Sequence, residues 1–185
     1  MKTRLSTGIF IILFSVNAFS ADYFWVGGTG NWSDVINHWA TTSGGGTFHW
    51  EVPGEGDNVI FDANSFDAPG QVVTIDVIAT CHNMDWTGVT NNPTLEGDTG
   101  NNLEIWGSLD YDPAMTNSCS GSLHFHSTQQ DSVNMGGHLC LNDVVFDGIG
   151  EWILEDALNI PGNYLYLVEG VILRTWIDFE YRYSF

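Results

Sequence analysis

The sequence predicts an all-β fold in which short strands stack as a right-handed parallel β-solenoid, and two observations support this prediction. Pairs of proline, glycine, asparagine and aspartate separate short alternating apolar runs, and no window after residue 20 repeats its apolar residues with the 3.6-residue period of a helix. The clearest runs cover residues 72–75, 103–106, 123–125, 139–146 and 164–168.

The second observation is internal similarity. Residues 82–89 align with 142–149 at an offset of 60, and residues 102–107 align with 157–162 at an offset of 55. One copy is too small to bury its inward residues alone, so the copies must stack against each other. A β-sandwich also produces short strands at such spacing and stays the alternative.

Residues 21–70 are expected to form an aromatic, glycine-rich cap ahead of solenoid repeats over 71–173. Three tryptophans recur there at every seventh position: Trp25, Trp32 and Trp39. A helix would place them in one stripe, but three glycines lie between the first two and would each cost about 1 kcal/mol in a helix. We therefore predict a short aromatic strand, a glycine turn and a segment bounded by tryptophans.

The motifs of this cap resemble those of a known class of proteins. The run W-x-G-G-x-G-N-W-S-D extends from Trp25 to Asp34, and the run P-G-x-x-D-x-V-x-F extends from Pro53 to Phe61. Together with Trp39 they resemble the start of secreted β-solenoid surface proteins, the passenger-like and adhesin-like proteins of Gram-negative bacteria, particularly Bacteroidota. The resemblance covers about residues 23–173; it implies a solenoid at the cell surface and says almost nothing about the ligand.

Residues 1–20 are predicted to be an export signal. Lys2 and Arg4 provide its positive start, residues 8–16 its apolar core, and residues 18–20 a small-x-small cleavage site before Ala21. The apolar run is shorter than the roughly 20 residues that span a bilayer, so we expect no membrane insertion after cleavage. The predicted location is secreted, extracellular or on the outer cell surface.

The charge of the remaining chain restricts its partners. All 23 acidic residues lie beyond residue 20, where Arg174 and Arg182 are the only Lys or Arg residues, so 2 − 23 gives a net charge of −21. Nucleic-acid binding needs basic side chains to neutralise phosphates, so we expect no nucleic-acid partner, and anionic membrane surfaces are poor partners. The acids can keep an exported chain soluble and monomeric, or some of them can hold Ca²⁺.

Two loops are the candidates for Ca²⁺, the one cofactor that the sequence leaves open. Residues 57–67 and 97–102 are rich in aspartate, asparagine and glycine and can supply several oxygen ligands. Neither loop has the register of an EF-hand or of a glycine-aspartate nonapeptide repeat. Turn chemistry explains both loops equally well.

The histidines and cysteines suggest little more. His124 and His126 flank Phe125, so on a strand both point to one face. They could bind Zn²⁺ or Cu²⁺ with a third ligand such as His138, although nothing in the sequence places His138 nearby.

The chain has three cysteines, and this odd number allows at most one disulfide, whose pairing is open: Cys81, Cys119 and Cys140. Cys81 and Cys140 fall at nearly equivalent places in the two aligned copies. We assign no catalytic residue and no cofactor-binding residue, and the metal ligands stay unknown.

We expect a secreted or cell-surface structural and adhesive module without catalytic activity. Its partners would be neutral glycans or cell-surface proteins, and the chain would be a monomer or part of a longer chain. The alternative is a carbohydrate-binding or polysaccharide-degrading β-helix protein. Five carboxylates over residues 143–156 could supply an acid and a base.

Two further features bear on this expectation. Four tryptophans would stack on sugars if they were exposed: Trp50, Trp86, Trp106 and Trp152. Residues 174–185 depart from the repeat, and we expect them either to cap the solenoid or to mark a truncation.

The absence of lysine and arginine generates the first test. Trypsin cleaves after these residues, and residues 5–173 contain neither. We expect the full chain, unfolded in urea, to retain residues 5–173 within one large tryptic fragment, seen by mass spectrometry. Cleavage inside this region by pure trypsin would contradict the prediction.

Overall fold

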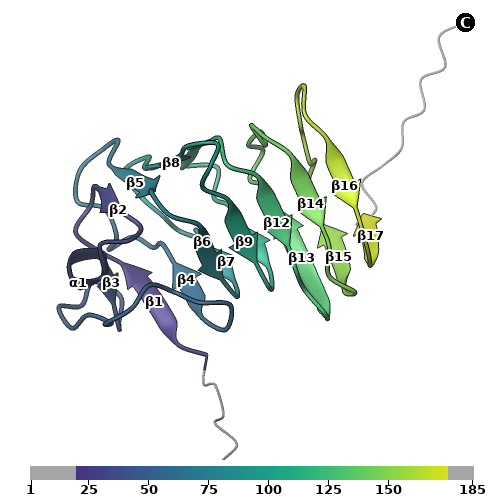
Figure 1. The fold of residues 1–185 in the computed structure, drawn as a ribbon. Helices are drawn as coiled ribbons and strands as arrows, with labels where there is room; N and C mark the ends of the chain where they lie inside the picture. The colour runs from purple at the N-terminus through teal and green to yellow at the C-terminus, as the bar shows by residue number, and fades with distance from the viewer. Residues whose placement is uncertain (1–19, 175–185) are drawn as a thin grey trace, which may run out of the picture.

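The computed structural model describes residues 20–174 and shows a parallel β-solenoid (Figure 1). Its described part contains 17 strands and one short helix, α1 (Val35–His38). The predicted all-β fold with stacked parallel coils is confirmed. Almost all of the predicted export signal and all but the first residue of the predicted tail lie outside the described residues. No helix in the described range 20–174 is long and apolar enough to cross a membrane.

Three sheets run along the stack, and each forms one side of it. Sheet A contains, in spatial order, β3 (Trp39–Ala40), β1 (Asp22–Trp25), β4 (Asn58–Ile60), β7 (Met84–Asp85), β10 (Leu109–Asp110), β13 (Gln130–Asn134), β15 (Glu151–Leu154) and β17 (Val171–Arg174). Sheet B contains β2 (Gly30–Asn31), β5 (Val72–Ile75), β8 (Thr94–Gly97) and β11 (Thr116–Cys119). Sheet C contains β6 (Ala79–Cys81), β9 (Leu103–Ile105), β12 (Leu123–Phe125), β14 (Val144–Phe146) and β16 (Leu165–Leu167).

One coil is one passage of the chain through sheets A, B and C. The strands β4, β5 and β6 form one coil, and β7–β9 and β10–β12 form the next two. After β12 the chain skips a regular strand in sheet B, where a parallel bridge between Leu139 and Asn159 continues that side. Every strand pair is parallel except β1 with β3. Residues paired in register on neighbouring coils show the length of a coil. Val59 and Met84 are 25 residues apart in sequence, and Leu103 and Leu123 are 20 apart.

The repeat proposed from sequence is therefore wrong in period, although the stacking inferred from it is correct. The alignment at an offset of 60 matches Met84 with Val144, but Met84 lies in sheet A and Val144 in sheet C. An offset of 60 equals about two and two-thirds coils. Strands on every side show the same buried–outward–buried alternation, so a strand of one sheet resembles strands of the other two.

The cap forms around tightly packed aromatic rings, and the one helix in its described residues is the four-residue α1. Trp25, Trp32 and Trp39 are fully buried, and the ring of Trp39 meets the other two edge to face, with centroids 4.9 Å from Trp25 and 4.8 Å from Trp32. The predicted glycine turn is present, because Gly28 has a φ of +74°, a conformation that disfavours other residues. The antiparallel strand β3 then pairs with β1 and covers this end of sheet A.

Aromatic stacking continues from the cap into the coils. Phe61, Trp86 and Tyr111 each follow a strand of sheet A in consecutive coils and are buried. The rings of Phe61 and Trp86 stack with centroids 3.7 Å apart, and Tyr111 meets Trp86 edge to face. Phe125 and Phe146 stack in the same way inside sheet C. The core is thus a set of columns, each formed by one residue per coil.

Carboxylates join neighbouring coils at the corners between sheets A and B. Asp156, after β15, accepts hydrogen bonds from the backbone N–H groups of Met135 (2.8 Å) and Gly137 (2.9 Å) in the preceding coil. Asp112, after β10, accepts one from the N–H of Gly88 in the coil before it. These acids satisfy backbone donors that the turns leave without a strand partner.

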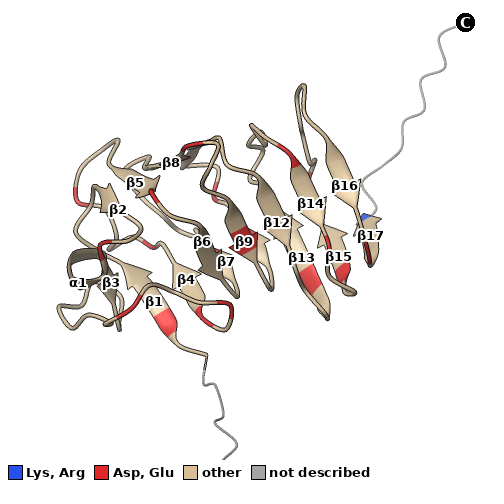
Figure 2. Cartoon of the chain, viewed as in Figure 1, with Lys and Arg blue, Asp and Glu red and all other residues tan. Residues whose placement is uncertain are grey.

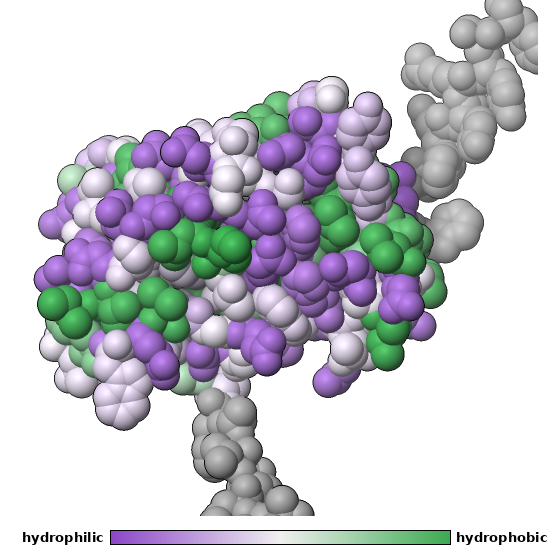
Figure 3. All heavy atoms as spheres, viewed as in Figure 1, coloured by the Kyte–Doolittle hydropathy of each residue, from purple (hydrophilic) through white to green (hydrophobic). Residues whose placement is uncertain are grey.

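The last described coil leaves its inward residues uncovered by other described residues. Leu165 pairs in register with buried Val144 yet is 48% exposed, and Leu167 pairs with buried Phe146 yet is 51% exposed. Figure 3 shows hydrophobic surface at this end of the stack, where β16 and β17 lie. The two ends of the described stack therefore differ, since the aromatic cap covers the other one.

The corner carboxylates generate a stability prediction. Asp156→Ala removes the acceptor of two backbone donors, and we expect the free energy of unfolding to fall by about 1–3 kcal/mol. The matched control is Glu155→Ala, because Glu155 is exposed and its side chain makes no hydrogen bond or ion pair in the described structure. Urea unfolding followed by tryptophan fluorescence measures both. Equal stability of the two variants would show that the corner bonds contribute nothing.

Candidate functional site

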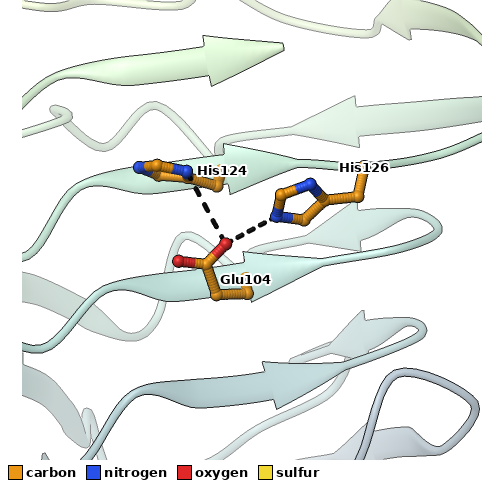
Figure 4. Close-up of side chains that lie close together, drawn as sticks. All are labelled: Glu104, His124 and His126. Carbon is orange, nitrogen blue, oxygen red and sulfur yellow. Dashed lines mark hydrogen bonds and ion pairs between the residues drawn. The ribbon is translucent and has the colours of Figure 1, made fainter. Parts of the chain in front are cut away.

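A cluster of two histidines and one glutamate lies on the outer face of sheet C. His124 and His126 lie on or directly after β12 and flank inward-facing Phe125, as the sequence predicts for one strand face. Glu104 lies on β9 and pairs in register with His124, so its carboxylate points to the same side (Figure 4).

The three side chains are close enough to coordinate one ion together. Glu104 Oε2 lies 2.5 Å from His126 Nε2 and 3.6 Å from His124 Nδ1. One ligand atom of each residue lies within 4.8 Å of the other two. The side chains of His124, Glu104 and His126 are 24%, 15% and 21% exposed, so the cluster is partly sheltered yet open to solvent.

The other ring nitrogen of His126 faces a second carboxylate. Its Nδ1 lies 2.6 Å from Oδ1 of Asp147, which directly follows β14. The ring of Trp106 stacks on the imidazole of His126 with centroids 4.3 Å apart. His126 is thus held by a carboxylate at each nitrogen and by an indole against its face. A neutral imidazole donates only one hydrogen bond, so it cannot donate to both carboxylates at once.

The suggested third ligand His138 is wrong. Its Nε2 lies 3.1 Å from the backbone oxygen of Asp112, and its ring packs near Tyr111, so it belongs to the corner that follows sheet A. Glu104 takes the place that the sequence left open. A comparison of residues 103–106 with 123–126, both runs of alternating inward and outward residues 20 apart, would have brought Glu104 beside His124.

The two loops considered for Ca²⁺ differ in how their carboxylates are used. Asp57 accepts hydrogen bonds from the N–H groups of Ala21 and Gly54, and Asp62 accepts one from Asn64. In the second loop, Asp98 lines an open polar groove along sheet B together with other acids, Asp76 and Glu96. Ca²⁺ binding by either loop stays a prediction.

The acidic stretch 143–156 is distributed over the stack. Asp143 accepts a hydrogen bond from the backbone N–H of Tyr164, and Glu151 accepts one from the side-chain amide of Gln130. Asp156 accepts the corner hydrogen bonds described above. Asp147 belongs to the histidine cluster. Each of these four carboxylates therefore already has a partner. The expectation that the protein has no catalytic activity stays a prediction.

The four tryptophans considered for sugar stacking have different environments. Trp86 and Trp152 are fully buried, Trp106 packs on His126, and Trp50 is 90% exposed. A pair of exposed aromatic residues was missed. Tyr164 and Tyr166 lie on the outer face of sheet C with ring centroids 6.0 Å apart, and they are 67% and 45% exposed.

The three cysteines form no disulfide and are buried. The expectation that Cys81 and Cys140 occupy equivalent places is wrong, because Cys81 ends β6 in sheet C while Cys140 follows the Leu139 bridge on the side of sheet B. Burial raises the pKa of the thiols of Cys81 and Cys119 above the ordinary value. Burial, and to a smaller extent the charge of Asp156, raises the pKa of Cys140 to about 12.

Comparison with known proteins adds no family to this description. No family model matches the chain, and no curated protein or solved structure is similar enough to match. The interpretation of the site therefore depends on its own residues.

The buried thiols generate a labelling prediction. Only the thiolate reacts with a disulfide reagent, and burial both blocks access and raises the thiol pKa. We expect Ellman's reagent at pH 8 to label none of the three cysteines in the native full chain and all three in urea. Rapid labelling of a native thiol, located by mass spectrometry and compared with its Cys→Ala variant, would contradict the described packing.

Proposed function

We propose that this protein is a secreted or cell-surface structural and adhesive module that binds neutral glycans without catalytic activity of its own. The observation that carries the proposal is the pair of exposed tyrosines on the outer face of sheet C. Tyr166 lies on β16 and Tyr164 directly precedes this strand, and the parallel pairing of β16 with β14 fixes the backbone beneath the two rings. Such a pair presents apolar ring faces and two hydroxyl groups to a sugar.

The charge pattern supports a neutral partner. Acidic residues occur along the whole stack, and the only basic side chain of lysine or arginine in the described residues is Arg174 at its end (Figure 2). An anionic polymer would meet repulsion on every side. A neutral glycan or an uncharged patch of a cell-surface protein meets none.

The stack itself supports the structural part of the proposal. The coils hydrogen-bond to their neighbours along sheets A and C, and along sheet B as far as β11, so the outward side chains are held in columns at fixed spacing. A surface of this kind suits broad contact. The runner-up is a polysaccharide-degrading β-helix protein, which would use Asp143 and Glu151 as acid and base.

A glycan array probed with the full chain tests the proposal. We expect binding to neutral glycans that falls at least about tenfold, or 1.4 kcal/mol, in a Tyr164→Ala/Tyr166→Ala double variant, because both stacking faces are lost. The matched control is the Tyr164→Phe/Tyr166→Phe variant, which keeps the rings. Trp50→Ala removes an exposed aromatic residue elsewhere and should leave binding unchanged.

A reducing-end assay on the bound glycans separates adhesion from catalysis. We expect no release of sugar ends. Release that disappears in Asp143→Asn or Glu151→Gln would overturn the adhesive proposal in favour of hydrolysis. Absence of both binding and release would favour a spacer that holds other domains away from the cell.

A further inference from the structure

We propose that Glu104, His124 and His126 bind a divalent transition-metal ion of the zinc class on the outer face of sheet C. The proposal is independent of the adhesive function, because it depends on a different set of side chains. It goes beyond the sequence prediction, which found only two of the three ligands.

The spacing of the donor atoms fits a small metal ion. Tetrahedral Zn²⁺ with bonds of about 2.1 Å places its ligand atoms about 3.4 Å apart. Glu104 Oε2 and His124 Nδ1 are already 3.6 Å apart. Glu104 Oε2 and His126 Nε2 are 2.5 Å apart, so they must separate by about 1 Å, which a rotation of the glutamate side chain can provide.

Asp147 is the independent observation that points to a metal. A histidine that binds a metal generally donates its other ring N–H to a carboxylate, which fixes the tautomer and the ring orientation. Oδ1 of Asp147 lies 2.6 Å from Nδ1 of His126, on the side opposite Glu104. This oxygen is buried and, among the described residues, has no hydrogen-bond partner, so its contact with His126 is a close charge contact that a small rotation of either side chain would align. With the proton on Nδ1, the lone pair of Nε2 points at Glu104 and at the proposed ion.

The charges around the cluster favour the ion. Two carboxylates flank His126, while no lysine or arginine occurs between residues 5 and 173 to balance them. A divalent ion bound with two neutral imidazoles would neutralise Glu104 and Asp147 together.

The donor set selects the kind of ion. Two imidazole nitrogens and one carboxylate suit Zn²⁺, Cu²⁺ or Ni²⁺, whereas Ca²⁺ requires six to eight oxygen ligands and Mg²⁺ prefers octahedral oxygen coordination. The partial exposure of all three side chains lets an ion enter from solvent and lets water complete its coordination. We therefore expect Zn²⁺ to bind in the presence of excess Ca²⁺ and Mg²⁺.

Calorimetric titration of the EDTA-treated full chain with Zn²⁺ tests the proposal. We expect one ion per chain, with affinity retained in millimolar Ca²⁺ and Mg²⁺. Glu104→Gln, His124→Gln and His126→Gln should each weaken binding by at least about 100-fold, and Asp147→Asn by about 10- to 100-fold. The matched control is His82→Gln, since His82 is another half-buried histidine outside the cluster, directly after β6 of sheet C; its affinity should stay within about twofold of the parent chain.

A second measurement on the unaltered chain does not depend on the variants folding. Zn²⁺ should shift the ring NMR signals of two of the six histidines, His124 and His126, and Co²⁺ in its place should produce visible d–d absorption. Far-UV circular dichroism checks that each variant is folded. The proposal is overturned if no saturable binding near one equivalent occurs. It is also overturned if the ligand variants bind like the parent, or if His82→Gln weakens binding as strongly as they do.

Discussion

Parallel pairing of one coil with the next is the constraint on which the rest of this structure depends. A single coil has about twenty to twenty-five residues and cannot bury its inward side chains alone, so its stability comes from its neighbours. The pairing also decides which residues meet, because in-register strands place equivalent positions directly above one another. The column of Phe61, Trp86 and Tyr111 shows the result: three residues 25 apart in sequence become a continuous aromatic stack. Coils of different length pair in the same register because the extra residues lie at the corners. There, carboxylates such as Asp156 accept hydrogen bonds from backbone N–H groups that have no strand partner.

The same rule creates the chemistry on the outside of the stack. Outward residues also form columns, and in sheet C one column contains Thr80, Glu104, His124, Val145 and Tyr166. Glu104 meets His124 for the same reason that Leu103 meets Leu123 on the inside. A polar cluster therefore needs no loop or cleft in this fold. It needs complementary residues at the same outward position of successive coils, which a sequence can acquire one coil at a time.

The sequence allowed the fold class to be predicted, because strand alternation and turn pairs are local signals. It did not allow the register to be predicted, because all three sides of the stack share one alternation, and a match such as Met84 with Val144 joins strands of different sheets. Without the register, Glu104 had no visible relation to His124 and the third ligand was misplaced at His138. The role of the acids was hidden for the same reason, since the donors that Asp112 and Asp156 satisfy lie one coil earlier. The aromatic cap was easier to predict, because glycine between tryptophans excludes a helix on local grounds.

The shared column also determines how the two proposals relate. Tyr166 lies two strands beyond His124 in sheet C, and neighbouring strands are about 4.8 Å apart, so the backbones of these two residues are separated by about 10 Å. That separation places both sites on one face of the stack. Val145 lies between them and belongs to neither site. An ion at Glu104 would lower the negative charge of this face without touching the aromatic pair. The two sites use different side chains, so each can be removed by substitution while the residues of the other stay in place.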